Sequence, residues 1–336
     1  MSREWSVVSY ESGVMSWEKN GRHLCLKASL NPSLILQIRG YMKKALLQLH
    51  AAVFLWGFTG VLGRAISLEA TLLVWYRLLI TVISLWVLFA AQRKIHKISF
   101  KSALTIGGIG VILALHWVAF YGSIKLANVT IALTCLSTTA LLSSLIEPLI
   151  LKQRFQRSEI LLGLFAIAGI LIIYNTHLQF SWGIIVGLIS ALLTVLVSVL
   201  NKKIIHRYTP QQLTLYQLSG GFLGLTLLLP LLLQWSYGWQ TPTLADWLWL
   251  TVLSWACTIL TYFLYVRSLR KVSAFTINMT LTLEPLYGIV LAFVLYKENE
   301  HLSRWFYLGF LLIAIAVGLH MWRLLRPAPK KRTESV

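Results

Sequence analysis

The feature that most constrains the fold is a succession of apolar stretches, each about 20 residues long, between residues 45 and 322. A helix of about 20 residues crosses the roughly 30 Å hydrocarbon core of a bilayer. Backbone groups find no water there, so such stretches must be helical. The predicted spans are 45–63, 70–91, 102–122, 128–151, 159–175, 181–200, 211–233, 246–266, 273–295 and 305–322. The sequence therefore predicts an all-α integral membrane protein with ten transmembrane helices.

Composition supports a membrane protein over the soluble classes. The chain is 57% hydrophobic and only 12% charged, whereas about 25% of the residues of a soluble domain are charged. The three cysteines are scattered, which indicates neither a disulfide framework nor a zinc site. We therefore expect no metal and no cofactor.

The basic residues predict the orientation in the membrane. With the amino terminus in the cytoplasm, 25 of the 30 Lys and Arg residues fall in cytoplasmic segments, four fall in external segments, and Arg77 lies inside a span. Cytoplasmic loops of membrane proteins carry this excess, so both termini are predicted to be cytoplasmic. The net charge of +19 thus reflects topology, and the predicted partner is the lipid bilayer rather than nucleic acid.

Residues 1–41 differ from the rest, because polar, charged and aromatic residues mix there without a sustained period. Met42 then begins MKKALLQLHAAVFLWG, which has the form of a natural start before a first span. We expect residues 1–41 to be an extension that is disordered or absent from the working protein. The alternative is a short cytoplasmic surface helix around Leu30–Ile38. At the other end, residues 323–336 form a basic cytoplasmic tail.

The chain contains an internal repeat. KLANVTIALTCL (125–136) aligns with KVSAFTINMTLT (271–282), and collinear matches precede and follow this pair. The repeat predicts two five-helix halves, residues 42–176 and 181–322. Five is odd, so the second half enters the membrane from the opposite side. Such inverted repeats are typical of secondary transporters, which bind substrate near the midplane between the halves.

Four segments resemble EamA-type members of the drug/metabolite transporter superfamily. They are MKKALLQLHAAVFLWGFTGVLGR, LVWYRLL, FYGSIKLANVTIALTCLSTTALLSSLIEPLIL and FLYVRSLRKVSAFTINMTLTLEPLYGIVLAFVLYKE. The resemblance implies a ten-span carrier of the bacterial inner membrane that exports amino acids or other small metabolites. By resemblance, Arg77 matches the family's second-span arginine, and Lys297-Glu298 stands where the family has Gly-Glu. Substrate identity and the choice between monomer and homodimer stay open.

The resemblance also places Glu284-Pro285 at the polar break of the ninth span. Pro285 removes a backbone donor, which favours a helix break beside a cavity. A carboxylate at membrane depth is a functional candidate by default. Glu284 is therefore interpreted either as a group that binds a proton or a substrate amine, or as a neutral structural residue at the kink.

Three further polar residues are candidates for binding or coupling. Arg77 could pair with a substrate carboxylate or an ionic gate, or it could extend to the outer surface and bind backbone carbonyls. Gln217 is its mate in the repeat. His116 near mid-depth could titrate or bind substrate, or it could be a hydrogen-bonded core histidine.

The remaining candidates come from alignment and from aromatic character. Thr138 aligns with Glu284 across the repeat. Glu147 lies close to the predicted cytoplasmic loop, where an interfacial ion pair is the better interpretation. Four aromatic residues could line a cavity and stack on an organic substrate, although such residues usually serve packing. They are Trp56, Tyr76, Tyr262 and Tyr287.

These features favour a secondary transporter that exports small organic metabolites, such as amino acids, coupled to protons or to exchange. A membrane-embedded enzyme is one alternative, but it would require clustered acidic residues or histidines, and Asp246 is the chain's only aspartate. A passive channel is the other, and it would need no carboxylate at mid-membrane. We therefore predict that the chain is not an enzyme.

Overall fold

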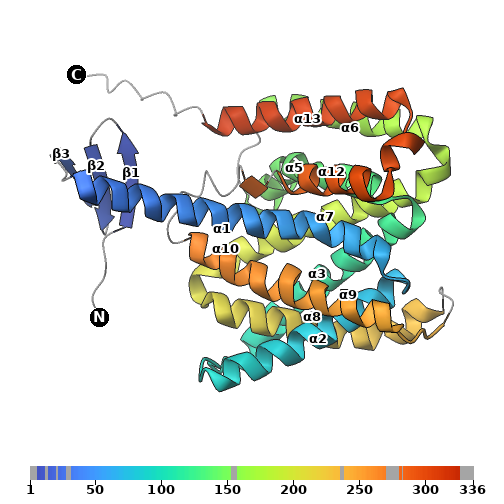
Figure 1. Cartoon of the computed structure of the whole chain (residues 1–336), viewed down its shortest axis with the longest axis horizontal. Coiled ribbons are helices and arrows are strands. Elements are labelled where there is room, and N and C mark those ends of the chain that lie inside the picture. The colour runs from blue at the N-terminus through green and yellow to red at the C-terminus, as the bar shows by residue number, and fades with distance from the viewer. Residues whose placement is uncertain are drawn as a thin grey trace.

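A computed structural model gives the fold of most of the chain (Figure 1). The described residues are 6–11, 14–19, 22–27, 32–152, 157–234, 238–269, 280–281 and 283–325. The strands are β1 (Ser6–Glu11), β2 (Val14–Lys19) and β3 (Arg22–Lys27). The helices of the first half are α1 (Pro32–Ala65), α2 (Ala70–Ala91), α3 (Phe100–Leu126), α4 (Val129–Ser137), α5 (Thr139–Leu151) and α6 (Arg157–Thr176). The helices of the second half are α7 (Ser181–Ile204), α8 (Pro210–Leu233), α9 (Leu244–Ser254), α10 (Thr261–Leu269), α12 (Glu284–Tyr296) and α13 (Arg304–Leu325).

The amino-terminal region differs from the irregular chain expected of residues 1–41. Strands β1, β2 and β3 pair in that order as an antiparallel sheet, which lies at one end of the long axis, away from the packed helices (Figure 1). Short alternations of Val, Tyr and Trp with polar residues favour strands. These alternations are too short to stand out beside the apolar stretches of about 20 residues that follow. Helix α1 begins at Pro32 and continues through Met42. Whether the native protein contains residues 1–41 stays a prediction.

Six described helices are long and apolar enough to cross a bilayer, and a seventh crossing is possible through a pair bent by 46°. The six are Lys44–Ala65, Ala70–Ala91, Phe100–Leu126, Leu178–Arg207, Pro210–Leu233 and Leu244–Tyr265. The bent pair is Val129–Ser137 with Leu141–Leu151, and shorter apolar helices cover Leu162–Thr176, Glu284–Tyr296 and Arg304–Leu319. The all-helical membrane architecture agrees with the sequence, while the count of ten spans stays a prediction.

Three predicted spans are irregular. The fourth divides at Thr138, between α4 and α5. The eighth contains a π-helical segment, Trp255–Leu260, between α9 and α10. In the ninth, α12 begins at Glu284, and of residues 271–283 before it only 280–281 and 283 are among the described residues. Such interruptions at membrane depth occur where backbone groups find partners inside the protein or line a cavity.

Glycines set the closest crossings between helices. A Cβ atom placed on Gly110 of α3 would lie 1.8 Å from the carbonyl oxygen of Gln217 in α8. Likewise, a Cβ on Gly57 of α1 would lie 2.8 Å from the carbonyl oxygen of Glu284, and one on Gly169 of α6 would lie 2.6 Å from that of Gly309. Small residues let membrane helices approach this closely. Each crossing joins a first-half helix to a second-half helix.

The two predicted halves are interleaved rather than stacked as separate units. Helix α3 contacts α7 and α8, α2 contacts α8 and α9, and α1 contacts α10 and α12. Helices α4 and α5 contact α7, and α6 contacts α13. In Figure 1, α6 and α13 form the upper edge of the bundle and α2 the lower edge. The interior between the halves therefore belongs to both of them.

Candidate functional site

A cavity of about 370 Å³ lies between helices of both halves. We call it the Arg77 cavity. It extends from Arg77, in the first third of α2, to Asn201, Ile205 and Pro210 where α7 connects to α8. Its volume lies within the range of small-molecule sites. Four residues that the sequence singled out line it, namely Trp56, Arg77, Gln217 and Tyr262.

Arg77 is buried and bound by hydroxyl groups. Its Nε and Nη2 donate to Thr258 Oγ1 at 3.3 and 2.9 Å, and its Nη1 donates to Tyr121 Oη at 2.9 Å. The guanidinium carbon lies 3.9 Å from the ring centroid of Trp117. Only 4% of the residue is exposed, so it does not extend to the surface. The described residues that line the cavity include no Asp or Glu.

The π-helical segment explains how Thr258 reaches Arg77. Thr258 Oγ1 donates its own proton to the carbonyl of Leu253, five residues earlier, at 2.9 Å. That bond directs the oxygen lone pairs toward the guanidinium. Ser254 Oγ also donates to the carbonyl of Arg77 at 3.1 Å. Single π-helical turns are frequent at functional sites because they redirect side chains in this way.

Three buried polar atoms in the cavity wall make no hydrogen bond with the described part of the protein. They are Asn201 Oδ1, Gln217 Nε2 and Tyr262 Oη, although the Thr214 side chain is close to Tyr262. Leaving a buried donor or acceptor unpaired costs about 1–3 kcal/mol. Water or a ligand in the cavity would supply the missing partners.

His116 lies outside the Arg77 cavity, between α3 and α7. Its Nδ1 is 2.9 Å from Ser190 Oγ, 3.0 Å from the Ser190 carbonyl oxygen and 2.7 Å from Thr194 Oγ1. The ring also stacks on Phe120, with 6.3 Å between centroids. This placement fits a hydrogen-bonded core histidine.

Three other candidates also lie away from the cavity lining. Tyr287 Oη is 3.0 Å from His50 Nδ1. Tyr76 is buried against Trp247, with 5.5 Å between ring centroids. Thr138 Oγ1 donates to the carbonyl of Cys135 at 2.6 Å, at the break between α4 and α5. Each of these contacts is consistent with packing or with a local helix end.

Glu284 is the first residue of α12, and Pro285 stands in the first turn. The backbone carbonyl of Glu284 faces Gly57 at the crossing with α1, and the Glu284 side chain is half-buried. It makes no hydrogen bond or ion pair with another residue that the structure describes. It does not line the described Arg77 cavity. Its role in binding or coupling stays a prediction.

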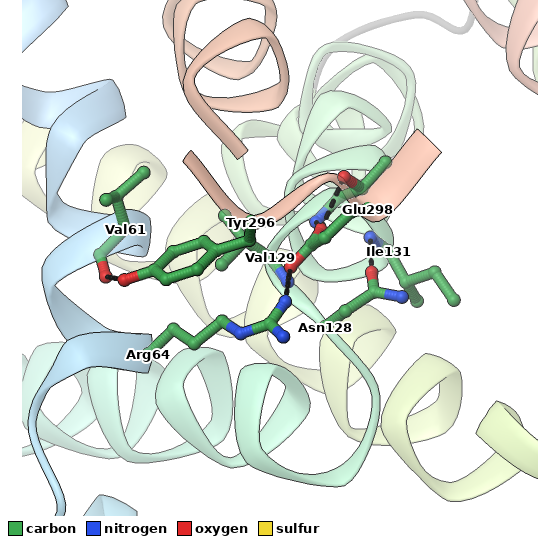
Figure 2. Close-up of polar contacts among 8 residues, drawn as sticks. Val61, Arg64, Asn128, Val129, Ile131, Tyr296 and Glu298 are labelled. Carbon is green, nitrogen blue, oxygen red and sulfur yellow. Dashed lines mark hydrogen bonds and ion pairs between the residues drawn. The ribbon is translucent and has the colours of Figure 1, made fainter. Parts of the chain in front are cut away.

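Glu298 organises a second polar site, the Glu298 cluster, after the end of α12 (Figure 2). Its carboxylate is 2% exposed and forms an ion pair with Arg64. It also accepts from the backbone N–H of Val129 at 3.1 Å, and from the N–H and Oγ1 of Thr130 at 2.8 and 2.6 Å. A carboxylate at a helix amino terminus satisfies free N–H groups and the helix dipole. Glu298 thus ties α1 to the start of α4.

The ring of Tyr296 supports Arg64 in the same cluster. The guanidinium carbon of Arg64 lies 4.4 Å from the ring centroid, and Tyr296 Oη donates to the carbonyl of Val61 at 2.9 Å. Asn128 Oδ1 accepts from the N–H of Ile131 at 2.8 Å and caps α4 (Figure 2). The cation therefore stacks on an aromatic ring while it pairs with the carboxylate.

More contacts between the halves gather at this end of the bundle, which we call the Glu298 end. Asp246 accepts from Ser67 N–H and Oγ, both at 2.7 Å, and Gln240 Oε1 accepts from the N–H of Glu69 at 2.9 Å. Within the first half, Lys125 donates to the carbonyl of Ile66, which directly follows α1. The end of α1 and the segment between α12 and α13 lie at the right of Figure 1.

The opposite end, the Glu147 end, carries the ion pair predicted for Glu147, and that pair is confirmed. Glu147 of α5 pairs with Lys202 of α7, and both side chains are partly or largely exposed. Tyr208 Oη also donates to Ser102 Oγ at 2.8 Å. The Arg77 cavity extends toward this end.

Three residues that contact Arg77 were not predicted from the sequence, namely Trp117, Tyr121 and Thr258. The role of Glu298 as a link between the halves was not predicted either. Helical spacing held a signal for Trp117 and Tyr121. Leu113, Trp117 and Tyr121 recur at intervals of four residues, which places them on one face of α3. A search for polar residues alone passes over such a face.

Comparisons with known proteins agree with this architecture. The EamA-like transporter family matches two segments, residues 43–175 and 181–320. A comparison with curated proteins finds no match. Among solved structures, 22 chains match. One, a crystal structure described only as that of a protein, has a TM-score of 0.55 and 16% sequence identity, and the match covers 84% of this chain and 99% of that chain. At this identity the likeness shows the fold alone.

Proposed function

This chain belongs to the EamA-like transporter family, and from that premise we propose that it is a secondary active transporter that exports small organic metabolites, such as amino acids. The resemblance found in the sequence is thereby confirmed at the level of the family. Its members are transporters and not enzymes, so the chain is a multi-pass membrane protein of this class. The observation that carries the finer proposal is the Arg77 cavity, which both halves line and which holds a buried cation.

The pattern of helix contacts supports an inverted repeat. If α2 corresponds to α8 and α3 to α9–α10, the contact of α3 with α8 becomes the contact of α2 with α9 when the halves are exchanged. If α1 corresponds to α7, the contact of α1 with α12 becomes that of α7 with α4 and α5. Helices α5 and α12 are each 13 residues long and end at a lysine with positive φ, 54° at Lys152 and 51° at Lys297.

Alternating access follows from the contrast between the two ends. The Glu298 cluster closes one end, and the cavity extends toward the Glu147 end. With the orientation that the basic residues predict, the Glu298 end faces outward and this conformer faces the cytoplasm. Export then requires the Glu298 cluster to open while contacts form at the other end, as one half rocks against the other.

The first experiment tests export itself. Extracellular metabolites of bacterial cells that overexpress the chain are compared, without preselection of targets, with those of cells that lack it. We expect at least one small organic metabolite to accumulate outside the overexpressing cells. An unchanged profile across growth conditions would count against an exporter.

A second experiment tests Glu284 as the coupling group. Glu284→Gln keeps the shape of the neutral acid but cannot titrate. In liposomes loaded with an exported metabolite, this variant should still exchange substrate at equal concentrations, yet fail to accumulate it when a proton gradient is imposed. Glu300→Gln, at an exposed site near the Glu298 cluster, serves as the control. Gradient-driven accumulation at the wild-type rate would remove Glu284 from the coupling mechanism.

A further inference from the structure

We infer that the Arg77 cavity selects organic monoanions, namely carboxylates with an apolar or aromatic body, in preference to zwitterionic amino acids. The inference rests on the proposed function: it keeps small organic metabolites as the substrates and replaces amino acids, the example given there, with organic monoanions. Three observations carry it: the charge of the cavity, the donors left free on Arg77, and the aromatic character of the wall.

The charge of the cavity is unbalanced. Arg77 is 4% exposed, and the groups that bind it are the hydroxyls of Thr258 and Tyr121 and the ring of Trp117. A buried charge is stable only when it is paired and hydrogen-bonded. Because the described lining residues include no Asp or Glu, an anionic ligand would complete the pairing.

The donors left on Arg77 fit a carboxylate. A guanidinium has five N–H groups, and three are used by Thr258 and Tyr121. One N–H therefore remains on each terminal nitrogen. Two N–H groups on one planar cation match the two oxygens of a carboxylate.

The same lining disfavours a zwitterion. The ammonium group of an amino acid would enter a cavity whose described lining carries a cation and no carboxylate. Like charges in a buried site repel, and the ammonium would lose its hydration without gaining an anionic partner. The ligand body, by contrast, would meet aromatic side chains at Trp56, Tyr262 and Tyr265, which favour apolar and aromatic groups.

Two unpaired amide groups add a specificity element. Gln217 Nε2 is a donor and Asn201 Oδ1 is an acceptor, and both are buried in the wall without partners in the described part of the chain. A hydroxyl group on the ligand body could satisfy either of them, whereas a keto group could only accept from Gln217 Nε2. The cavity thus offers one anion position and further sites for neutral polar substituents.

The test compares three probes with a phenyl ring and different charges. The purified full-length protein in nanodiscs is titrated calorimetrically with 3-phenylpropanoate, L-phenylalanine and 2-phenylethylamine. We expect 3-phenylpropanoate to bind at least about tenfold more tightly than L-phenylalanine, and 2-phenylethylamine to bind more weakly than either. Equal or tighter binding of L-phenylalanine or 2-phenylethylamine, or no binding of 3-phenylpropanoate, overturns the inference.

Two variants locate the effect. Arg77→Lys keeps the charge but loses the planar pair of donors, so 3-phenylpropanoate affinity should fall about tenfold or more. Gln217→Glu brings a carboxylate into the wall and should shift the preference toward L-phenylalanine. Because Gln217 Nε2 has no partner to lose, this variant remains informative if Arg77→Lys does not fold. Gln211→Glu, on the same helix but outside the cavity lining, should leave the preference unchanged, and unchanged preference in Gln217→Glu would contradict the inference.

The inference and the proposed function fail in different ways. If overexpressing cells export metabolites while the protein prefers L-phenylalanine to 3-phenylpropanoate, the transporter stands and the substrate class is wrong. If no metabolite is exported, the proposed function itself fails.

Discussion

The two ends of the helical bundle use the same kind of ion pair in different surroundings. At the Glu298 end the carboxylate of Glu298 is 2% exposed, pairs with Arg64, whose side chain is 40% exposed, and also accepts hydrogen bonds from the start of α4. At the Glu147 end the carboxylate of Glu147 is 26% exposed and its lysine partner is 58% exposed. Removing one partner of a buried ion pair is strongly destabilising, because the other partner stays buried without a counter-charge. An exposed ion pair contributes little to the free energy of unfolding.

The difference between the two ends indicates that this conformer is closed at the Glu298 end. Around Glu298, groups of both halves satisfy one another, including the link between Asp246 and Ser67. Toward Glu147 the interior contains the Arg77 cavity and unpaired polar atoms of Asn201 and Gln217. One end thus has a completed polar network, and the other leaves polar groups for a ligand or water.

The largest expected effect comes from removing Glu298. Glu298→Ala removes the partner of Arg64 and leaves the buried N–H groups of Val129 and Thr130 without their acceptor, at about 1–3 kcal/mol for each N–H group, so the free energy of unfolding should fall by about 2–6 kcal/mol. Equilibrium unfolding in detergent micelles measures this change. Glu300→Ala is the control, because Glu300 is exposed and only two residues away. Equal effects of the two substitutions would mean that the Glu298 cluster does not hold its end together.

The second-largest loss of stability is expected from a substitution where α3 crosses α8, between the two ends. Gly110→Ala forces a methyl group against the carbonyl of Gln217, and overpacking of this kind costs about 1–3 kcal/mol. The same unfolding measurement applies. Gly108→Ala is the matched control on the same helix, because a Cβ there meets no atom within 4 Å. Because Ala favours a helix more than Gly does, Gly108→Ala should be neutral or stabilising, and a cost there as large as that at Gly110 would show that the crossing of α3 with α8 is not responsible.

A smaller effect is expected at the Glu147 end. A double-mutant cycle with Glu147→Gln and Lys202→Gln should give a coupling energy of about 0.2–1 kcal/mol, the range of exposed pairs. The corresponding cycle with Arg64→Gln and Glu298→Gln should give a clearly larger value. If the Glu147 pair couples as strongly as the Glu298 pair, the contrast between the ends is not one of burial.

The smallest expected effect is a pH dependence at the Glu298 end. Burial lowers the pKa of His177 below its ordinary value of 6.5, and its Nε2 accepts from the N–H of Ser303 at 3.2 Å. The unfolded chain then binds more protons than the folded one below the unfolded pKa, so stability should fall as the pH drops from about 7 to 5.

His177→Gln should remove this part of the slope. Unfolding midpoints across that pH range measure it, with His206→Gln as the control, because His206 is exposed near the opposite end. An unchanged slope in His177→Gln, or an equal loss of slope in His206→Gln, would place the titrating group elsewhere.

The helices themselves could be predicted from the sequence because lipid leaves the backbone little choice. The predicted span 70–91 coincides with α2, and 181–200 and 211–233 lie within α7 and α8. Family membership also followed from the sequence, since its motifs are ordered segments of the chain. The three strands near the amino terminus did not, because short alternating segments carry a weak signal.

Hydropathy and spacing determined which segments are helices, and charge predicted their orientation. Only the tertiary structure decided which candidates share a cavity. His116 and Trp117 are neighbours in sequence and equal in depth, yet the helix turns about 100° between them. Trp117 therefore stacks with Arg77 while His116 bonds to α7. Packing against neighbouring helices sets the rotation of each helix about its axis, as at the crossing of Gly110 with Gln217. The residues of one segment do not show which helices it packs against, so that rotation could not be predicted from the sequence.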